Sequence, residues 1–264
     1  MELQSLYPDK TILKVFAELF SKSDPFPFYW SFASGYYLFN PKEITIMMLM
    51  ERYQKAVEDL LAKVRATQTE TIQKAGQLIA DSVANGGKIY LAEICHSIQM
   101  DFIYRGGGPI FYKHFKKEEH WESMKAGDVL VVSSVSGRTQ HVVDMAWEAM
   151  ERGITVIAFT SMEYATQVDP VHPSGKKLYE FVTLAVDNCA PAAEAMLEVE
   201  GIEARFAAAS GIASDYIMWN ITSCVVENLL AKGITPGILK SANFPGGADY
   251  NKSVVEPNYD KFGW

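Results

Sequence analysis

The sequence predicts an α/β fold: a three-layer α/β/α sandwich in which a parallel sheet of five strands is covered by helices on both faces. Short apolar runs alternate with longer amphipathic stretches over most of the chain, and this alternation is typical of parallel sheets. The run at 128–134 is nearly continuous and β-branched, as expected for a strand buried on both faces. With 264 residues, the chain fits one large domain or a domain with an extension.

Two amphipathic helices are expected before the sheet. The first begins at Glu51 and carries an apolar stripe at three- and four-residue spacing, formed by Val57, Leu60, Leu61 and Val64. The second, over 71–85, carries Ile72, Ala75, Ile79 and Val83 and ends at Gly86-Gly87, a C-terminal glycine signal. The first stripe has no obvious partner in a sheet already covered by its own helices. We therefore expect a homodimer or a homotetramer.

The strands follow in order after the glycine pair. They are expected at 88–94, 109–115, 128–134, 154–160 and 181–187. Between the third and the fourth, the stretch 141–153 has helical periodicity and stops at Gly153. After the fifth strand we expect a loop region and then a long helix from about Ser214 to Lys232.

Residues 1–46 differ from the rest of the chain and are treated as an extension to a domain at 47–264. Eight aromatic residues lie between Phe26 and Phe39, in a segment interrupted by prolines and a glycine. One interpretation is an arm that places aromatic side chains on a partner subunit. The other, which we favour, is a start assigned too far upstream: the codons of Lys42-Glu43 can form a bacterial ribosome-binding sequence at a suitable distance before Met47.

The composition excludes several classes of protein. The 24 Lys and Arg against 32 Asp and Glu give a net charge of -8, which disfavours binding to nucleic acid or to a membrane surface. There is no long apolar run and no secretory signal, so we expect a cytoplasmic protein. The three cysteines lack a paired spacing, and the scattered histidines add no metal-ligand pattern. We expect no metal and no cofactor.

The segment after the third strand is the best candidate for a binding site. In an open parallel sheet, ligands bind outside the carboxyl ends of the strands. Ser134, Ser136 and Thr139 can donate hydrogen bonds to an anion there, and Gly137 lets the backbone approach it closely. The helix that follows adds the free N–H groups of its first turn. The alternative is that a serine or threonine only caps this helix. Three hydroxyls and a glycine within six residues favour a phosphate site.

The pattern S-x-S-G-x-T at 134–139 resembles the sugar isomerase (SIS) domain of phosphosugar isomerases and sugar-phosphate-sensing regulators. Three further segments, HPSGKKLYE at 172–180, VDNCAP at 186–191 and SANFPGG at 241–247, resemble a bacterial subfamily of SIS-domain proteins. The resemblance covers about Glu51 to Asn251. It implies a flavodoxin-like, doubly wound sheet, an N-terminal helical hairpin used in dimerisation, and a phosphate held by the 134–139 loop, Arg138 included.

Two departures from the subfamily concern the chemistry. Where the subfamily has G-T-G-H-S after the first strand, this chain has Glu93-Ile94-Cys95-His96-Ser97, so both glycines are lost. We expect the side chains of Glu93 and Cys95 to narrow the site or to change its ligand. The next helix carries paired glutamates in the subfamily, and here those positions are Met100 and Asp101. The lost glutamate puts isomerase activity in question.

Two functions from different classes therefore remain. The first is an aldose–ketose isomerase for a phosphorylated sugar or amino sugar, with His96 and Glu194 as the catalytic pair and with Ser97 and His172 joining the binding loop. The second is a non-catalytic protein that binds or senses a sugar phosphate. Ser210, before the long helix, could cap that helix or contact the ligand. The sequence does not identify the sugar.

Overall fold

The structure, a computed structural model, describes residues 48–96 and 98–262. The chain divides into two units, Met1–Met48 and Leu49–Trp264, and the described helices and strands all belong to the second. The aromatic segment at 26–39 lies outside the described residues. Both interpretations of residues 1–46, a partner-binding arm and a start assigned too far upstream, therefore stay predictions.

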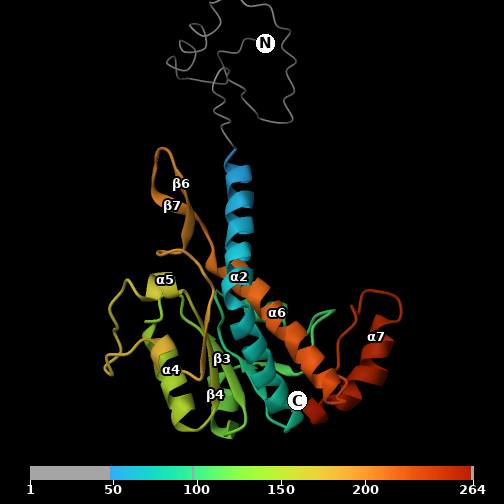
Figure 1. The fold of residues 1–264 in the computed structure, drawn as a ribbon. Coiled ribbons are helices and arrows are strands. Elements are labelled where there is room, and N and C mark those ends of the chain that lie inside the picture. The colour runs from blue at the N-terminus through green and yellow to red at the C-terminus, as the bar shows by residue number, and fades with distance from the viewer. Residues whose placement is uncertain (1–47, 97, 263–264) are drawn as a thin grey trace, which may run out of the picture. The chain divides into compact units, whose positions relative to one another are not determined.

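The second unit is the predicted three-layer α/β/α sandwich (Figure 1). Its five strands are all parallel and lie in the order β2-β1-β3-β4-β5. They are β1 (Ile89–Leu91), β2 (Tyr112–His114), β3 (Val129–Ser133), β4 (Thr155–Thr160) and β5 (Leu184–Asp187). Each lies within its expected range, and the order is that of a flavodoxin-like doubly wound sheet. The expected fold class is confirmed.

Helices cover the two faces of the sheet. The long ones are α2 (Leu49–Ala84), α4 (Gln140–Glu151) and α6 (Ser210–Ala231); the short ones are α3 (Lys117–His120), α5 (Met162–Ala165) and α7 (Gly247–Tyr250). Single turns of 3-10 helix lie at Ile98–Asp101, Trp121–Ser123, Leu178–Glu180, Glu256–Asn258 and Asp260–Phe262, and a π-helical turn spans Asn251–Val255. In Figure 1, α4 lies on one side of the sheet, and α2 and α6 lie on the other.

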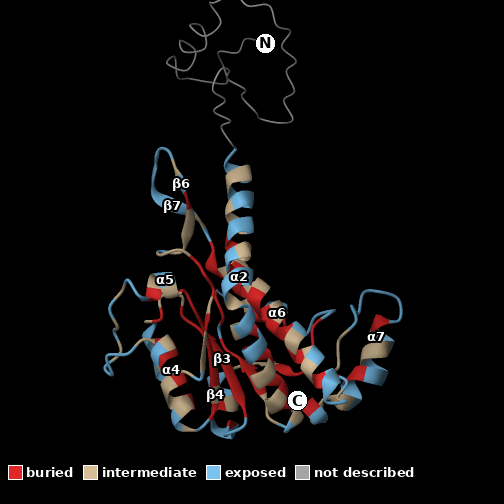
Figure 2. Ribbon diagram, in the orientation of Figure 1, coloured by how far each residue is buried: buried red, intermediate tan, exposed pale blue. Residues whose placement is uncertain are grey.

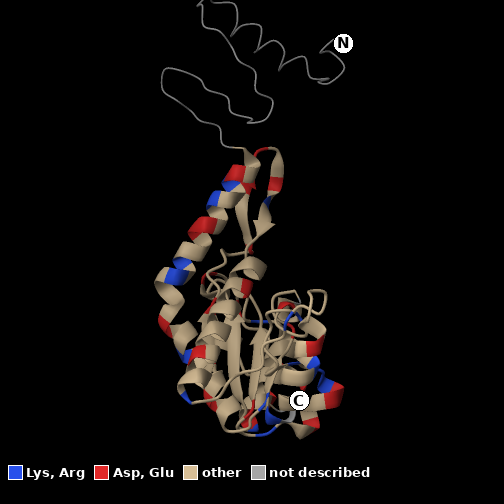
Figure 3. Ribbon diagram, turned by 90° about the vertical axis from the view of Figure 1, so that its right-hand side faces the viewer, with Lys and Arg blue, Asp and Glu red and all other residues tan. Residues whose placement is uncertain are grey.

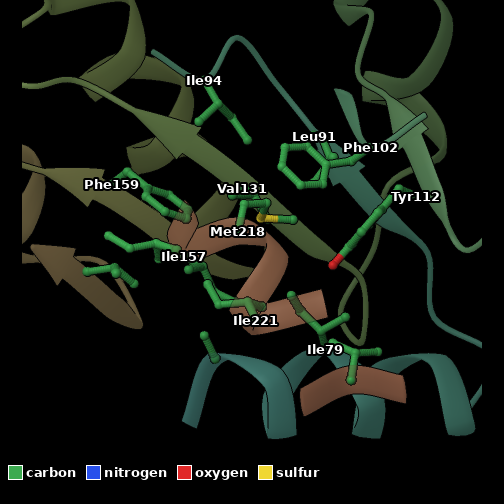
Figure 4. Packing of buried hydrophobic residues seen from close by; sticks show 14 of the residues in the cluster. Ile79, Leu91, Ile94, Phe102, Tyr112, Val131, Ile157, Phe159, Met218 and Ile221 are labelled. Atoms are coloured by element: carbon green, nitrogen blue, oxygen red, sulfur yellow. The ribbon is translucent and has the colours of Figure 1, made fainter. Parts of the chain in front are cut away.

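The two cores follow from the alternation of side chains along each strand. In β3, Val129 and Val131 pack toward α2 and α6, whereas Leu130 and Val132 pack toward α4. All five residues of β3 are buried, so the sequence pattern of a strand covered on both faces is explained (Figure 2). Figure 4 shows the larger core, where Ile79 of α2 and Ile221 of α6 approach the sheet.

The expected helical hairpin at the N-terminus is wrong. Residues 51–85 do not form two helices: they lie in the single helix α2, which has 36 residues. Its middle contains no glycine or proline before Gly76, and the hydroxyls of Thr67 and Thr69 donate to the carbonyls one turn earlier, at Lys63 and Arg65. The two helices were expected on either side of residues 65–70, which are mostly polar, but polar residues are compatible with a continuous helix. Acidic and basic residues are interleaved along α2 (Figure 3).

An antiparallel hairpin was missed in the loop region expected after β5. It is formed by β6 (Ala195–Val199) and β7 (Ile202–Ala208), joined at Glu200-Gly201. The glycine at the turn, between Val199 and Ile202, is the sequence signal that could have found it. The hairpin contacts α2, where the Arg52 guanidinium donates to the carbonyl of Glu198.

The burial of the apolar stripe of α2 also affects the expectation of an oligomer. Leu60 and Val64 of the α2 stripe are buried within the chain, and Val57 and Leu61 are half-buried. Because much of the stripe already has partners in its own subunit, it is weaker support for a second subunit than the sequence suggested. The homodimer or homotetramer stays a prediction.

Close packing of α2 on α6 gives a test of this architecture. A methyl group at Gly76 would lie 2.5 Å from Cys224 Cβ, so Gly76→Ala should lower the free energy of unfolding by about 1–3 kcal/mol, as overpacking does. In α6, an added Cβ at Gly211 has no atom within 4 Å, so Gly211→Ala should leave stability unchanged or raise it slightly. Urea denaturation of both variants measures the difference. Equal stability of the two would contradict the packing described.

Candidate functional site

The carboxyl edge of the sheet between β1 and β3 is the place where a doubly wound sheet of this strand order binds ligands. Residues 89–91 pair in parallel with residues 129–131, so the loops that follow the two strands lie side by side. The first loop holds His96, and the second is 134–139. The fold therefore brings together the two segments singled out from the sequence.

The 134–139 loop presents unpartnered backbone donors. Gly137 has a φ of +68°, and its N–H donates to the carbonyl of Ser134 at 2.9 Å, which turns the chain toward α4. Within the described part of the chain, no acceptor is found for the backbone N–H groups of Ser136, Arg138, Gln140 and His141. Free N–H groups at the start of a 12-residue helix attract an anion.

The Ser134 hydroxyl, which was expected to donate to an anion, forms hydrogen bonds within its own loop. Its hydroxyl is buried and donates to Thr139 Oγ1 at 2.8 Å, while it accepts from the Thr139 N–H at 3.2 Å. The hydrogen of Ser134 is thus used within the loop, and the bond holds the exposed Thr139 side chain in place. Thr139 precedes α4 but makes no side-chain capping bond, which removes the main support for the capping alternative.

Gly137 and Arg138 complete the loop. Any Cβ at Gly137 would be strained by the positive φ and would lie 3.3 Å from Ala165 Cβ, so only glycine fits well. Arg138 is half-buried, and its guanidinium has no hydrogen bond or ion pair with another described residue. The loop therefore carries one uncommitted positive charge beside its free N–H groups.

The loop after β1 keeps a glycine-like backbone without glycines. Cys95 and His96 have φ values of 37° and 61°, both in the left-handed region that costs a residue with a Cβ some strain. Glu93 is exposed, whereas Cys95 points inward and is 5% exposed. Of the two side chains expected to narrow the site, only that of Cys95 fills space beneath it.

Cys95 is held in a buried polar cluster at the strand ends. Its Sγ lies 3.0 Å from the Ser133 hydroxyl and 3.0 Å from the Ser214 hydroxyl, and Asn188 Nδ2 donates to Ser214 Oγ at 3.4 Å. Burial raises the pKa of the Cys95 thiol, so it stays protonated near neutral pH. The cluster joins the ends of β1, β3 and β5 to α6 and forms the floor of the candidate site.

The two residues predicted as a catalytic pair lie close together. His96 Nε2 is 3.9 Å from Glu194 Oε2, with the imidazole 79% exposed and the carboxylate 24% exposed. Glu194 lies at the base of the β6–β7 hairpin, and its carbonyl accepts from the N–H of Ala209, next to α6. The missed hairpin is therefore the element that carries Glu194 to His96.

His172 lies elsewhere. Its Nε2 is 3.0 Å from Asp144 Oδ1, its Nδ1 lies 2.6 Å from Ser174 Oγ, and its ring is 5.8 Å from that of Trp147. These partners belong to the middle of α4 and to its own loop, whereas the candidate site lies at the first turn of α4. The contacts describe a histidine that fastens the 172–177 loop to the surface of the domain.

Two further expectations concern the segment after His96. Ser97, expected to bind substrate, lies outside the described residues. Met100 and Asp101 lie in the short 3-10 helix of residues 98–101, and Asp101 pairs with Arg105 at 2.5 Å.

Asp215 is a candidate that the sequence analysis missed. Burial, and then the nearby Asp101 carboxylate, raise the pKa of Asp215, and one of its oxygens is buried with no hydrogen-bond partner among the described residues. Its one signal in the sequence is that it is the only charged residue in α6 before Glu227. It lies next to Ser214, which belongs to the polar cluster.

Two features of the described residues, 48–96 and 98–262, concern metal ligands and membrane-spanning helices. In that part of the chain no three His, Cys, Asp or Glu side chains are grouped as metal ligands would be. None of the helices there combines the length and the apolar character that a membrane crossing needs. The absence of a cofactor stays a prediction.

Comparison with known proteins now defines the class. The family model "SIS domain" matches residues 52–120 and 111–161. The UPF0309 protein of Oceanobacillus iheyensis is 31% identical over 242 residues, which cover 81% of this chain and 98% of the relative. The UPF0309 protein of Streptomyces avermitilis is 31% identical over 241 residues, with 81% and 96% covered. This chain carries an SIS domain. It belongs to the UPF0309 family.

Solved structures with some similarity are more distant. Phosphoheptose isomerase GmhA from Neisseria gonorrhoeae is 16% identical, with a TM-score of 0.46 over 69% of this chain and 98% of that one. The Vibrio vulnificus NanR protein complexed with ManNAc-6P is 14% identical, with a TM-score of 0.47 over 81% of this chain and 69% of that one.

The role assigned to Ser134 can be tested by stability. Ser134→Ala removes two hydrogen bonds inside a buried turn and should lower the free energy of unfolding by about 1 kcal/mol, the usual value for such bonds. Ser136→Ala is the matched control, because the Ser136 hydroxyl has no bond to a described residue and its loss should leave stability unchanged. Urea denaturation of the ligand-free protein compares the two. If Ser136→Ala is the more destabilised variant, the roles are reversed.

Proposed function

We propose that this protein binds a phosphorylated sugar or amino sugar at the carboxyl edge of its sheet and interconverts the aldose and ketose forms. The proposal rests on one feature of the structure: the loop before α4, which has free backbone N–H groups, lies at the same edge of the sheet as the His96–Glu194 pair. The loop can hold a phosphate, and the pair can move a proton. The match to an SIS domain supports the class of substrate.

The phosphate is assigned to the 134–139 loop. Ser136 and Thr139 donate through their hydroxyls, and the backbone N–H groups at the start of α4 point to the same place. Arg138 adds the charge that balances the dianion. This binding is local, so it is compatible with the overall charge of -8, which argues against nucleic acid and membranes as partners.

The reaction moves one proton between neighbouring carbons and needs no cofactor. A base removes the proton from C2 of the open-chain aldose, the C–H electron pair forms the C1–C2 double bond, and the carbonyl pair moves onto O1. O1 then gains a proton and O2 loses one. As the C2–O2 carbonyl forms, the electron pair of the C1–C2 double bond takes up the proton at C1, and the product is the ketose. We assign to His96 the removal of the proton from C2 and its return at C1. Glu194 balances the charge of the protonated imidazole.

The second candidate is a non-catalytic protein that binds or senses a sugar phosphate. Two observations favour it: the imidazole of His96 is largely exposed, and Asp101 is already paired with Arg105. A catalytic base works best when its surroundings shield it from water. The two functions share the phosphate loop and differ only in proton transfer, so separate experiments address them.

Binding is tested with Ser136→Ala. The variant loses one donor to the phosphate and should weaken the binding of a sugar phosphate by about 1–3 kcal/mol, as expected when a charged acceptor loses its partner. A thermal-shift screen against hexose and amino-sugar phosphates finds a ligand, and isothermal titration then measures its affinity. Ser123→Ala, an exposed serine outside the loop, is the control. Unchanged affinity in Ser136→Ala would mean that the loop does not hold the phosphate.

Catalysis is tested in deuterated water. An enediol intermediate exchanges the C2 hydrogen with solvent, so NMR should show deuterium entering the bound sugar phosphate, and His96→Ala should abolish this uptake while ligand binding is retained. Retained binding shows that the phosphate loop is intact in the variant. Tight binding of a sugar phosphate by the unmodified protein, with no uptake from any compound of the panel, would instead favour the non-catalytic function.

A further inference from the structure

The first turn of α6 contains a buried hydroxyl with no partner. Ser210 is the first residue of this helix and is 1% exposed, and its Oγ has no hydrogen bond to any described residue. Buried hydroxyls are nearly always paired, so an unpaired one needs an explanation. The expected capping role is not the explanation, because the residue before the helix is Ala209 and no side chain caps this end.

The surroundings of Ser210 place it at the candidate site. Ser214, one turn further along α6, contacts Cys95 Sγ at 3.0 Å, and residues four apart share one face of a helix. Ser210 therefore lies on the face that is turned to the loop holding His96. Because the Cα–Cβ bond tilts toward the N-terminus of a helix, its hydroxyl is directed to the carboxyl edge of the sheet.

The helix end itself offers more donors. The backbone N–H groups of Ser210, Gly211 and Ile212 have no acceptor in the described part of the chain. They begin a helix of 22 residues, whose dipole makes this end positive. At Gly211 no atom lies within 4 Å of an added Cβ, so there is open space beside these donors. The N–H of Ala209 is bonded to Glu194, which ties this end of α6 to the proposed catalytic pair.

We infer that the N-terminus of α6, with the Ser210 hydroxyl, is a second anion subsite that holds the sugar oxygen on which negative charge develops. The inference rests on the proposed function. When His96 takes the proton from C2, the carbonyl oxygen O1 becomes an enediolate oxygen. Donors already aimed at that position stabilise the charge as it forms. The N-termini of two helices then hold different parts of the substrate: that of α4 holds the phosphate, and that of α6 holds the reacting oxygen.

Two phosphorylated probes separate these subsites. D-arabinonohydroxamate 5-phosphate carries a hydroxamate group, which mimics the enediolate and becomes anionic on losing its proton, whereas D-arabitol 5-phosphate has the same number of carbons and the phosphate but no such group. Isothermal titration should show the hydroxamate binding at least about tenfold more tightly to the unmodified protein. In Ser210→Ala that advantage should fall about tenfold or more, while the affinity for the arabitol phosphate stays unchanged.

A stability measurement excludes a merely structural role. Because the Ser210 hydroxyl has no hydrogen-bond partner among the described residues, Ser210→Ala should unfold at the same temperature as the unmodified protein or higher. Ser223→Ala, which removes an exposed hydroxyl further along α6, is the matched control and should change neither the melting temperature nor the binding of either probe.

The outcomes distinguish this inference from the function on which it rests. Equal affinities of the unmodified protein for the two probes would overturn the second subsite, and so would a Ser210→Ala variant that keeps the full hydroxamate advantage. In both cases, binding of the arabitol phosphate that weakens in Ser136→Ala would leave the phosphate site standing. If neither probe nor any sugar phosphate binds, the proposed function and this inference fall together.

Discussion

The parallel pairing of β1 with β3 is the constraint on which the rest of the site depends. The pairing directs the carboxyl ends of both strands to one edge, so residues about 40 positions apart in the chain become neighbours there. The strands are held in this register by burial on both faces, because a shift of one residue would exchange the side chains that face α2 and α6 with those that face α4. The hydrophobic cores thus determine which loops meet.

Unfavourable local features are concentrated at that same edge. Cys95 and His96 after β1, and Cys189, Ala193 and Glu194 after β5, all have a positive φ without being glycine. Each such conformation costs free energy and persists only because the surrounding structure imposes it. The buried hydroxyl without a partner, that of Ser210, lies at this edge as well. Strained backbone and unpaired polar groups gathered in one place are typical of functional sites.

Cys95 forms part of the floor of the site, beneath a loop whose backbone is of the kind that glycine adopts. Its thiol fills the space between the ends of β1 and β3 and lies within hydrogen-bond distance of Ser133 and Ser214. The floor of the site is therefore polar and closely packed. The position of His96 above that floor follows directly, because it is the next residue.

The sequence by itself determined the layers, the five strands and the position of the serine-rich loop after β3. These features depend on periodicity and on residues close together in the chain: the apolar run of β3, the Gly153 stop of α4, and the serines around Gly137. Local patterns were less reliable where polar residues interrupt a helix. The continuity of α2 and the packing of the β6–β7 hairpin against it depend on contacts between distant segments, although Gly201 marks the turn of the hairpin in the sequence.

Only the tertiary structure decided what each polar side chain does. From the sequence, Ser134, His172 and Ser210 were all candidates for contact with a ligand. Their partners in the structure differ: Ser134 is bonded to Thr139, His172 lies against Asp144, and Ser210 is bonded to no described residue. The pairing of His96 with Glu194 and the burial of Asp215 also appear only in three dimensions. The physical reason is that hydrogen bonding and desolvation depend on neighbours brought together by folding, whereas a sequence pattern records only the residue types.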